Sequence, residues 1–560
     1  MSDSLRRPSA TAAIVILTAV VIVLSTRFVS GCLGGSCQTD GDGTQTVPMV
    51  PYWIPFVGHV PEFILTPERL LRGARDAYAQ GVFALKIFGT THNLIYSPSL
   101  AQSLLSQKES VAAHHDVSWC IMKQVFGFPA RLEKEYNVAL HPILAAYQHL
   151  LKEPYLGDML GVTVRNLEQS IPDLVTFTSS IVDQAPWERG VDVRVLQGTD
   201  GQQTVEVSLL PLIRDFVAHA VTPSFLGSSF SDNHPTWTAD IVDLDRGFLL
   251  MAAGFPRWVP IRTLTKAYLA QARLLCTIRA FHVALEKHVC GEDAGPEWRD
   301  MSDVSPIIMA RQAIYRHHGF TIEARAACEL AFLWAMNANA PVLIFWLILR
   351  ILSYSDHTLL SVIRAETEPY AKAFQPPREF PVPEPPQLKI ALDGLVSDCP
   401  RLKSCYIECL RLDSAPWSFK QVRQDFALRE SARDGPGMCE GFLLRQGSYA
   451  HVAHDLHNTD PSCFRKPDEW MPCRHVVVAN DQGVEKAEFG TIRAYGGGRS
   501  MCKGRVFAEK ECLVFAAGIL ALWEFEPVGQ KGWHIPAPGK ATAVAAPKGD
   551  VRVRIRRRLL

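Results

Sequence analysis

The sequence predicts a mainly α-helical fold with a minor β region, preceded by a single N-terminal transmembrane helix. Nineteen uncharged, mostly apolar residues lie between Arg7 and Arg27, which is about the length that crosses a bilayer core. Several long segments place apolar residues at three- and four-residue intervals, as amphipathic helices do. Strand-like alternation is confined to a few short segments, so the sheet content is expected to be small.

Composition indicates a folded protein and argues against nucleic-acid binding. Of the 560 residues, 48% are hydrophobic and 20% are charged, which is far from the composition of disordered chains. Lys plus Arg equals Asp plus Glu at 57 each, so no net positive field attracts phosphate backbones. The 14 Cys show neither CxxC pairs nor Cys/His ligand spacing, so neither a zinc module nor a compact disulfide framework is indicated.

The N-terminal region is expected to anchor the chain in a membrane. Residues 1–7 form a flank, residues 8–29 the transmembrane anchor, residues 30–55 a polar, proline-containing linker, and residues 56–560 the catalytic domain. The alternative is a cleaved signal peptide, because small residues stand near Ser30 and Gly31. We favour the anchor, since the rest of the chain is typical of a cytosolic enzyme. Arginines on both sides leave the orientation undetermined from charge alone.

Along the body, several segments have recognisable secondary-structure patterns. Residues 84–87 and 93–96 flank a turn containing Gly89, which predicts a β-hairpin. Residues 139–152 and 265–290 are predicted to be amphipathic helices. The proline-rich residues 374–386 are expected to form a loop between helices, and residues 551–555 a strand with one buried face.

Residues 321–352 predict a long apolar helix. A second membrane span is the alternative, but Asn337 and Asn339 disfavour contact with lipid, so a buried core helix is the preferred interpretation. Pro341 is expected to kink it, because proline removes the hydrogen bond to the carbonyl of Asn337. That carbonyl is a possible acceptor for a water molecule.

The window YGGGRSMCKGRVFA, residues 495–508, is the most informative part of the sequence. Glycines at 496–498 let the backbone approach a flat ligand closely. Cys502 precedes a predicted helix, whose dipole and amide N–H groups, with Lys503 and Arg505, favour a thiolate, and a stable thiolate is a metal ligand. The alternative for an isolated Cys is a buried thiol without a function.

This window resembles the haem-binding loop of cytochromes P450, whose pattern is F-x-x-G-x-x-x-C-x-G. Tyr495, Gly498, Cys502 and Gly504 fall on that pattern, with Tyr in place of the usual Phe. The resemblance implies haem b with Cys502 as the axial ligand of the iron. Arg499 stands one residue before the family's common Arg, with Ser500 in that place, and the resemblance implies that Arg499 contacts a haem propionate.

Two further motifs of the same family follow the expected order. Glu408 and Arg411 are three residues apart on a predicted helix, and Arg474 ends PDEWMPCRH, which resembles P-x-x-F-x-P-x-R with Trp470 in place of Phe. Alone, such a pair is usually solvated surface decoration. The resemblance implies that these three side chains meet behind the haem. No W-x-x-x-R motif for the second propionate is present, and His141 or Lys152 is a candidate substitute.

The apolar helix departs from the family at the position that relays protons to bound oxygen. An acid followed by Thr is usual there, whereas this chain has Ala338 followed by Asn339. A neutral amide orients water or a substrate oxygen but transfers protons poorly. The string WAMNANAPVLIFW resembles the corresponding helix of prostacyclin synthase and of sterol 7α-hydroxylases, and the other motif variants suggest a fungal member of this branch.

The resemblance implies a monooxygenase that uses O2 and electrons from NADPH-cytochrome P450 reductase to oxidise a lipophilic terpenoid, sterol or other secondary metabolite. It also implies a single-pass protein of the endoplasmic reticulum whose catalytic domain faces the cytosol. Basic residues Lys503, Arg505 and Lys510 either dock the reductase or are simply a solvated helix start. Two alternative functions remain: an isomerase or dehydratase that rearranges a peroxide without NADPH, and a non-catalytic haem-binding membrane protein.

Overall fold

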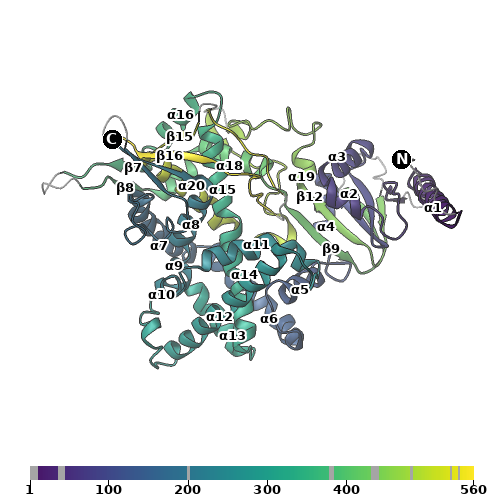
Figure 1. Cartoon of the computed structure of the whole chain (residues 1–560), viewed down its shortest axis with the longest axis horizontal. Helices are drawn as coiled ribbons and strands as arrows, with labels where there is room; N and C mark the ends of the chain where they lie inside the picture. Colours follow the sequence, from purple (N-terminus) through teal and green to yellow (C-terminus); the bar gives the residue numbers. More distant parts are fainter. Residues whose placement is uncertain are drawn as a thin grey trace, which may run out of the picture. The chain divides into compact units, whose positions relative to one another are not determined.

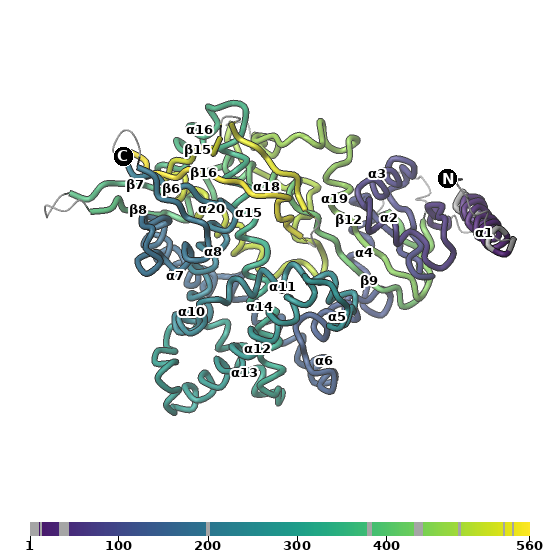
Figure 2. Tube along the Cα trace, viewed as in Figure 1, coloured from purple at the N-terminus to yellow at the C-terminus, as the bar shows by residue number. Residues whose placement is uncertain are grey.

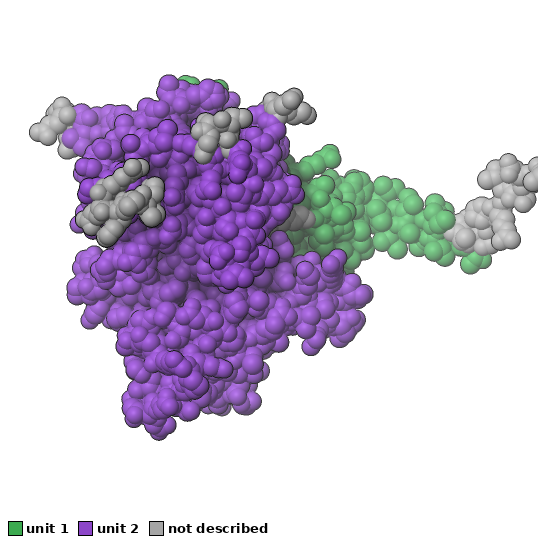
Figure 3. Space-filling view, turned by 60° about the vertical axis from the view of Figure 1, so that its left-hand side comes forward, with its two compact units in different colours: residues 1–118, 416–467, 491–501 green, residues 119–415, 468–490, 502–560 purple. Residues whose placement is uncertain are grey.

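The computed structural model describes residues 10–35, 44–197, 202–377, 384–430, 441–479, 483–529, 532–539 and 543–560. The chain divides into two compact units, coloured separately in Figure 3. Unit 1 comprises residues 1–118, 416–467 and 491–501, and unit 2 comprises residues 119–415, 468–490 and 502–560. The boundary at 501/502 falls inside the glycine-rich cysteine loop.

Unit 1 is built on a five-stranded sheet with strand order β2-β3-β12-β9-β4, of which β12 and β9 are labelled in Figure 1. The predicted hairpin is present as antiparallel β2 and β3, joined through Phe88 and Gly89, both at positive φ. Alternate residues of β9 are buried, so its side chains contact the unit's interior on one face. Unit 1 also contains β1, β10 and β11, which form a separate three-stranded sheet. The strands of both sheets are β1 (Thr44–Thr46), β2 (Val82–Ile87), β3 (Thr90–Ile95), β4 (Ala112–Ala113), β9 (Trp417–Val422), β10 (Phe426–Arg429), β11 (Gly441–Leu444) and β12 (Tyr449–Ala453).

The helices of unit 1 include the predicted membrane anchor, α1. The other helices are α2 (Val60–Leu65), α3 (Pro67–Ala77), α4 (Pro98–Leu105), α19 (His454–Asn458) and the 3-10 turn η5 (Gly498–Ser500), while α5 (His115–Gln124) carries the chain into unit 2. α1 (Ala10–Gly35) extends six residues into the stretch expected to be linker. Later in that stretch, β1 pairs in parallel with β11. The linker expectation for residues 36–43 falls outside the described residues.

The end of α1 is hydrogen-bonded to the proline-containing segment that follows. The Arg27 guanidinium donates to the carbonyl of Pro51 and lies 4.8 Å from the ring centre of Trp53. The Ser30 hydroxyl accepts from the backbone N–H of Tyr52 at 3.1 Å. The apolar residues 14–32 are long and apolar enough to span a membrane, and almost none of them is buried in the protein.

Unit 2 is mainly helical, as the sequence predicts (Figure 1). α15 and α20 form its buried centre, because nearly every residue of α15 and every residue of α20 from Glu511 onward is buried. The helices are α6 (Glu133–Ala146), α7 (Tyr155–Ser170), α8 (Leu209–Val221), α9 (Pro223–Leu226), α10 (Ser228–Asn233), α11 (Trp237–Ala252), α12 (Arg262–Val289), α13 (Pro306–His317), α14 (Ile322–Ala338), α15 (Ala340–Leu352), α16 (Thr358–Thr367), α17 (Leu392–Ser397), α18 (Pro400–Leu412) and α20 (Arg505–Leu522). Four 3-10 turns are η1 (Ala130–Leu132), η2 (Tyr147–Leu150), η3 (Ile171–Asp173) and η4 (Pro296–Trp298).

The strands of unit 2 form three small antiparallel sheets. They are β5 (Arg194–Gln197), β6 (Gln203–Ser208), β7 (Ala371–Phe374), β8 (Gln387–Ile390), β13 (Val476–Ala479), β14 (Val484–Ala487), β15 (Trp523–Pro527) and β16 (Arg552–Arg557). The predicted C-terminal strand is β16, which pairs with β6 from far earlier in the chain (Figure 2). The proline-rich loop connects strands β7 and β8 rather than two helices, because the residues at its two ends pair; residues 378–383 lie outside the described part.

The long apolar helix is interrupted as the proline predicts. α14 ends at Ala338, Asn339 has φ −113° and ψ −54°, and α15 begins at Ala340 with Pro341 in its first turn. Residues 322–352 are largely buried within the protein, which favours the core-helix interpretation over a second span.

Candidate functional site

Cys502 lies directly before α20, in an environment that suits a bound metal ion. Its sulfur accepts the backbone N–H groups of Gly504 and Arg505, which belong to the first turn of the helix. The Arg505 guanidinium donates to the carbonyl of Cys502 at 3.0 Å. The Cys502 side chain remains exposed, unlike the five buried cysteines among the described residues, so a ligand can reach the sulfur.

The protonation of Cys502 differs from the sequence-based expectation. Although Cys502 has exposed surface, the chain packed around the thiol desolvates it and raises its pKa, and the opposing effects of the two N–H groups, Arg505 and Lys503 are smaller. The protein alone therefore does not hold a thiolate. A metal cation on the sulfur would deprotonate it, since a coordinating thiol loses its proton outright.

The glycines of the loop differ in how closely other residues pack against them. Gly498 has φ +62°, and a Cβ there would come 2.5 Å from the carbonyl oxygen of Leu105, so only glycine fits against α4. A Cβ on Gly497 would also meet Leu105, at 2.6 Å from its Cδ1. At Gly504, in contrast, a Cβ would meet no atom within 4 Å. The protein itself therefore leaves open space at Gly504, which is two residues after Cys502.

Unit 1 holds a buried lysine that sequence reasoning missed. The Lys420 ammonium donates to the carbonyl of Gln107 at 3.1 Å, and no carboxylate of the described residues lies within 4.0 Å of it. Burial lowers its pKa, Glu109 raises it, and the positive charge of Arg499 lowers it. A buried ammonium that feels a second positive charge is costly unless an anion offsets it or its proton is lost. Its burial follows from its position on β9, where alternate residues are buried, and no pattern in the sequence marks it.

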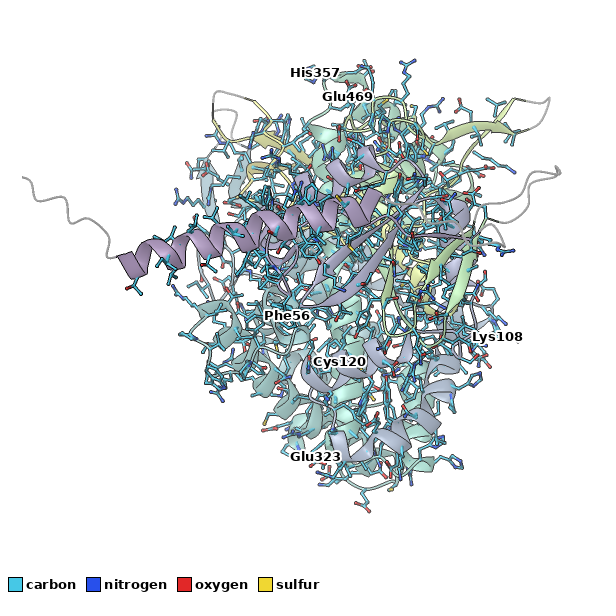
Figure 4. The ribbon with its side chains drawn as sticks, turned by 90° about the vertical axis from the view of Figure 1, so that its right-hand side faces the viewer. Phe56, Lys108, Cys120, Glu323, His357 and Glu469 are labelled. Atoms are coloured by element: carbon cyan, nitrogen blue, oxygen red, sulfur yellow. The ribbon has the colours of Figure 1, made fainter. Side chains whose placement is uncertain are left out.

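The structure brings Glu408, Arg411 and Arg474 together within unit 2. Arg411 donates Nε to Glu408 Oε2 at 2.8 Å and Nη2 to Oε1 at 2.7 Å. Arg474 donates Nε to Oε1 at 2.9 Å. Both guanidinium groups also donate to the carbonyl of Glu469, which is labelled in Figure 4. The side chains of Glu408 and Arg411 are fully buried, so this is no surface pair.

His475 is a fourth member of this cluster that the sequence motif did not indicate. Its Nε2–H donates to Glu408 Oε2 at 2.8 Å, and the Met471 backbone N–H donates to Oε1 at 3.0 Å. Burial by itself raises the pKa of Glu408, but the bonds from Arg411 and His475 and the charges around them lower it to about 2. The carboxylate is therefore ionised and held in a fixed position on α18.

At the break between α14 and α15, Asn339 makes a bond that limits its chemistry. Its Oδ1 accepts the backbone N–H of Val544 at 3.2 Å. Ala338 is the last residue of α14 and contributes no polar group. The neighbouring Asn337 is buried and donates Nδ2 to the carbonyl of Leu333 at 3.0 Å. The carbonyl oxygen of the Asn339 side chain is therefore engaged with the protein backbone.

The remaining predicted residues lie in simpler surroundings. Tyr495 is partly buried in the loop of unit 1, and Arg499 is exposed in η5. His141 on α6 and Lys152 after η2 are both exposed in unit 2. Lys503, Arg505 and Lys510 are half-buried at the start of α20.

Comparison with known proteins identifies relatives that cover most of the chain. The cytochrome P450 monooxygenase efuG of Hormonema carpetanum is 24% identical over 97% of this chain and 95% of its own length. The cytochrome P450 monooxygenase fsoE of Humicola fuscoatra is 23% identical, over 91% and 87%. The 25-hydroxycholesterol 7-alpha-hydroxylase of Rattus norvegicus is 24% identical over 56% of this chain and 71% of that protein. No protein-family model matches the chain.

Proposed function

This chain belongs to the cytochrome P450 superfamily, and we propose that it is a membrane-anchored haem-thiolate monooxygenase acting on a lipophilic small molecule. The observation that carries this proposal is Cys502, an exposed residue just before α20 whose sulfur accepts two backbone N–H groups. Relationship to fungal monooxygenases over nearly the whole chain supports the reaction type.

The residues suit the haem that the family implies. Cys502 supplies the sulfur ligand, and the open space at Gly504 admits a flat group close to the backbone. When bound, a thiolate-ligated haem activates dioxygen for insertion of one oxygen atom into a substrate. Glu408, Arg411, Arg474 and His475 keep α18 and the segment around Glu469 in a fixed arrangement within unit 2.

Unit 1 holds two cationic side chains that interact electrostatically, Lys420 and Arg499. We propose that an anionic group binds close to them within unit 1, because it would supply the negative charge that the buried Lys420 ammonium lacks. A carboxylate there would compensate for the desolvation of the ammonium. Exposed His141 and Lys152 offer no comparable buried charge.

The relatives and the apolar N-terminal helix both favour a lipophilic substrate. The mammalian relative, a 25-hydroxycholesterol 7-alpha-hydroxylase, is named for a sterol. A sterol, terpenoid or other apolar metabolite also suits an enzyme whose N-terminal helix is long and apolar enough to span a membrane. We propose NADPH-cytochrome P450 reductase as the electron donor, and the endoplasmic reticulum, with the catalytic units in the cytosol, as the location.

A second candidate is a haem-thiolate isomerase or dehydratase that acts on a peroxide and needs no NADPH. The observation that favours it is at Ala338 and Asn339, where an acid and an alcohol are absent and the amide oxygen already accepts from Val544. Proton delivery to bound oxygen then requires groups other than these two side chains.

Two measurements test the proposal. The reduced carbon monoxide complex of the purified protein should show the absorption band typical of thiolate ligation, and Cys502→Ala should abolish it. Cys512→Ala, at a buried cysteine within α20, is the matched control and should retain the band. A band that survives in Cys502→Ala would exclude Cys502 as the ligand.

The reaction class is tested on metabolites. Lipophilic extracts from the source organism with and without the gene are compared by accurate mass. A product heavier than its precursor by one oxygen atom supports the monooxygenase, whereas a product of unchanged mass supports the isomerase and a product lighter by one water supports a dehydratase.

A further inference from the structure

A polar groove of about 400 Å³ lies on one face of the five-stranded sheet in unit 1. One wall is the segment 46–49, which lies along the outer edge of β2, and the other is the turn 445–448, which precedes β12. Lys86 on β2 lies opposite Thr91 on β3, and Asn93 follows Thr91 by two residues. Because alternate residues of a strand share a face, these three side chains line the groove from the same side of the sheet.

The lining of the groove is positively charged. It contains Lys86 and Arg445, and no Asp or Glu. The Lys86 ammonium donates to the Thr91 hydroxyl at 3.2 Å, and no carboxylate of the described residues lies within 4.0 Å of it. Arg445 is exposed and donates Nη1 to Asp425, outside the lining, at 2.8 Å, which leaves its other N–H groups for a second acceptor. The groove therefore suits an anion that accepts several hydrogen bonds.

The backbone around Lys86 is held in place before any ligand binds. Its N–H donates to Nδ1 of His59 at 3.0 Å, and its carbonyl accepts the backbone N–H of His59 at 2.7 Å. Gly58 has φ +64°, and a Cβ there would come 2.1 Å from the same carbonyl oxygen. The far wall is also fixed, since Asn93 donates to the hydroxyl of Ser448 at 3.2 Å. An anion would therefore meet a site that is already formed.

One wall of the groove continues into residues that bond to the membrane anchor. The segment 46–49 leads to Pro51 and Tyr52, whose backbone groups bond to Arg27 and Ser30 near the end of α1. The chain between the groove and these bonds is only a few residues long, so the groove is held close to the membrane end of unit 1.

An exposed aromatic pair stands next to the groove. Gly89 lines the groove, and Phe88 precedes it in the hairpin turn. The ring centres of Phe56 and Phe88 are 6.5 Å apart, and the two residues are 69% and 58% exposed. Exposed apolar groups of this kind mark contacts with a membrane or another protein. Beside a membrane anchor, lipid is the favoured contact.

We infer that this groove binds the phosphate group of an anionic glycerophospholipid, with Lys86 and Arg445 as its cationic contacts. Such a lipid places its phosphate against the cations and its acyl chains against Phe56 and Phe88, whereas a free phosphate ion would leave the aromatic pair uncovered. The volume of about 400 Å³ lies within the range of small-molecule sites. The inference rests on the membrane anchoring within the proposed function, and it is independent of the haem and of the reaction.

Lipid retention by the full-length protein tests the groove. The protein is incorporated into nanodiscs of phosphatidylcholine with about one phosphatidic acid in ten lipids, released into neutral detergent, and weighed with its retained lipids by native mass spectrometry. Wild type should retain phosphatidic acid in preference to phosphatidylcholine. Lys86→Gln with Arg445→Gln should reduce that retention at least about ten-fold, because each cation near an anionic headgroup contributes about five-fold.

Two controls separate charge from structure. Lys108, labelled in Figure 4, is an exposed lysine of unit 1 outside the groove, so Lys108→Gln should retain the lipid as wild type does. Lys86→Arg with Arg445→Lys keeps both charges and should retain the lipid within about two-fold. Equal retention in wild type and the double Gln variant, or an equal loss in either control, would overturn the inference.

Two further comparisons distinguish a lipid from a free phosphate ion. Inorganic phosphate in large excess should leave the retained phosphatidic acid within about two-fold, because it cannot replace the contact of the acyl chains. Phe56→Ser with Phe88→Ser should lower retention although both cations remain. Displacement of the lipid by inorganic phosphate, or full retention in the aromatic variant, would overturn the lipid as the occupant.

Failure of the inference is distinguishable from failure of the proposed function. A wild-type protein without the thiolate-type carbon monoxide band contradicts the haem-thiolate enzyme, whatever lipid it retains. A full-length protein that alkali releases from membranes contradicts the anchoring. A normal band and a stable anchor, together with phosphatidic acid retention that does not depend on Lys86 and Arg445, contradict only the lipid site.

Discussion

At the scale of single residues, Glu408 carries the most concentrated set of interactions in unit 2. One fully buried carboxylate accepts from two guanidinium groups, an imidazole and a backbone N–H. Removing one partner of such a cluster leaves the other charged groups desolvated and unpaired. The free-energy cost of this change exceeds the net contribution of the cluster to stability. The cluster therefore holds α18 in a specific place rather than simply adding stability.

Glu408→Gln is predicted to destabilise the protein by about 3 kcal/mol at pH 7. The folded-state pKa of about 2 lies below the ordinary value of 4.5, so the ionised carboxylate stabilises the fold above pH 4.5. That contribution declines as pH falls from 4.5 towards 2. Urea unfolding at several pH values measures the difference between wild type and variant. Glu485→Gln, which breaks an exposed pair with Arg401, should cost less than about 0.5 kcal/mol.

Glu511 has the opposite pH dependence. It is buried on α20, its Oε1 has no hydrogen-bond partner, and burial raises its pKa to about 8. The folded state retains the proton that the unfolded state loses above pH 4.5, so this group costs stability as pH rises towards 8. Glu511→Gln is predicted to stabilise the protein more at pH 8 than at pH 5.5. A stability difference that is independent of pH in thermal unfolding would contradict the assignment.

At the scale of elements, the fold requires a glycine at one position of the glycine-rich loop, Gly498, and does not require one at Gly504. Gly498→Ala is predicted to destabilise unit 1 by more than 1 kcal/mol, because its φ is positive and its Cβ would strike the Leu105 carbonyl. Gly504→Ala should leave unfolding of the haem-free protein within about 0.5 kcal/mol but lower the haem content after reconstitution. Normal haem content in Gly504→Ala would mean that the space at Gly504 is not the haem's.

Local sequence patterns predicted those elements whose determinants lie within a few residues. They did not predict contacts between residues that are far apart along the chain. The β2–β3 hairpin follows from Gly89, and the helix break at Asn339 follows from Pro341, both within a few residues. The contact of His475 with Glu408 joins positions 67 residues apart, and that of Asn339 with Val544 joins positions 205 apart. Polar residues at such positions have no local signature, because the fold alone brings their partners near.

At the scale of the whole molecule, long-range strand pairing is the part that sequence reasoning could least supply. β1 pairs with β11 and β16 with β6, and a period-two pattern specifies a strand's buried face but not its neighbour. The proline-rich loop shows the same limit, since its end residues become strands only because they pair with each other. Motifs whose spacing reflects chemistry, such as the cysteine loop, are readable without that information.

The division of the chain between membrane and body yields the last prediction. The exposed large apolar residues of α1 are Ile14, Val15, Ile16, Leu17, Val20, Val21, Ile22, Leu24, Phe28 and Val29. Removing residues 1–29 is predicted to move the protein from the alkali-resistant membrane pellet to the supernatant with its unfolding free energy changed by less than about 1 kcal/mol, because α1 contributes few buried contacts. The exposed Phe56, labelled in Figure 4, and Phe88 follow the anchor within unit 1. Retention of the truncated protein in the pellet would show that the body holds the membrane by itself, and Phe56→Ser with Phe88→Ser in the truncated chain would then test whether this aromatic pair is responsible.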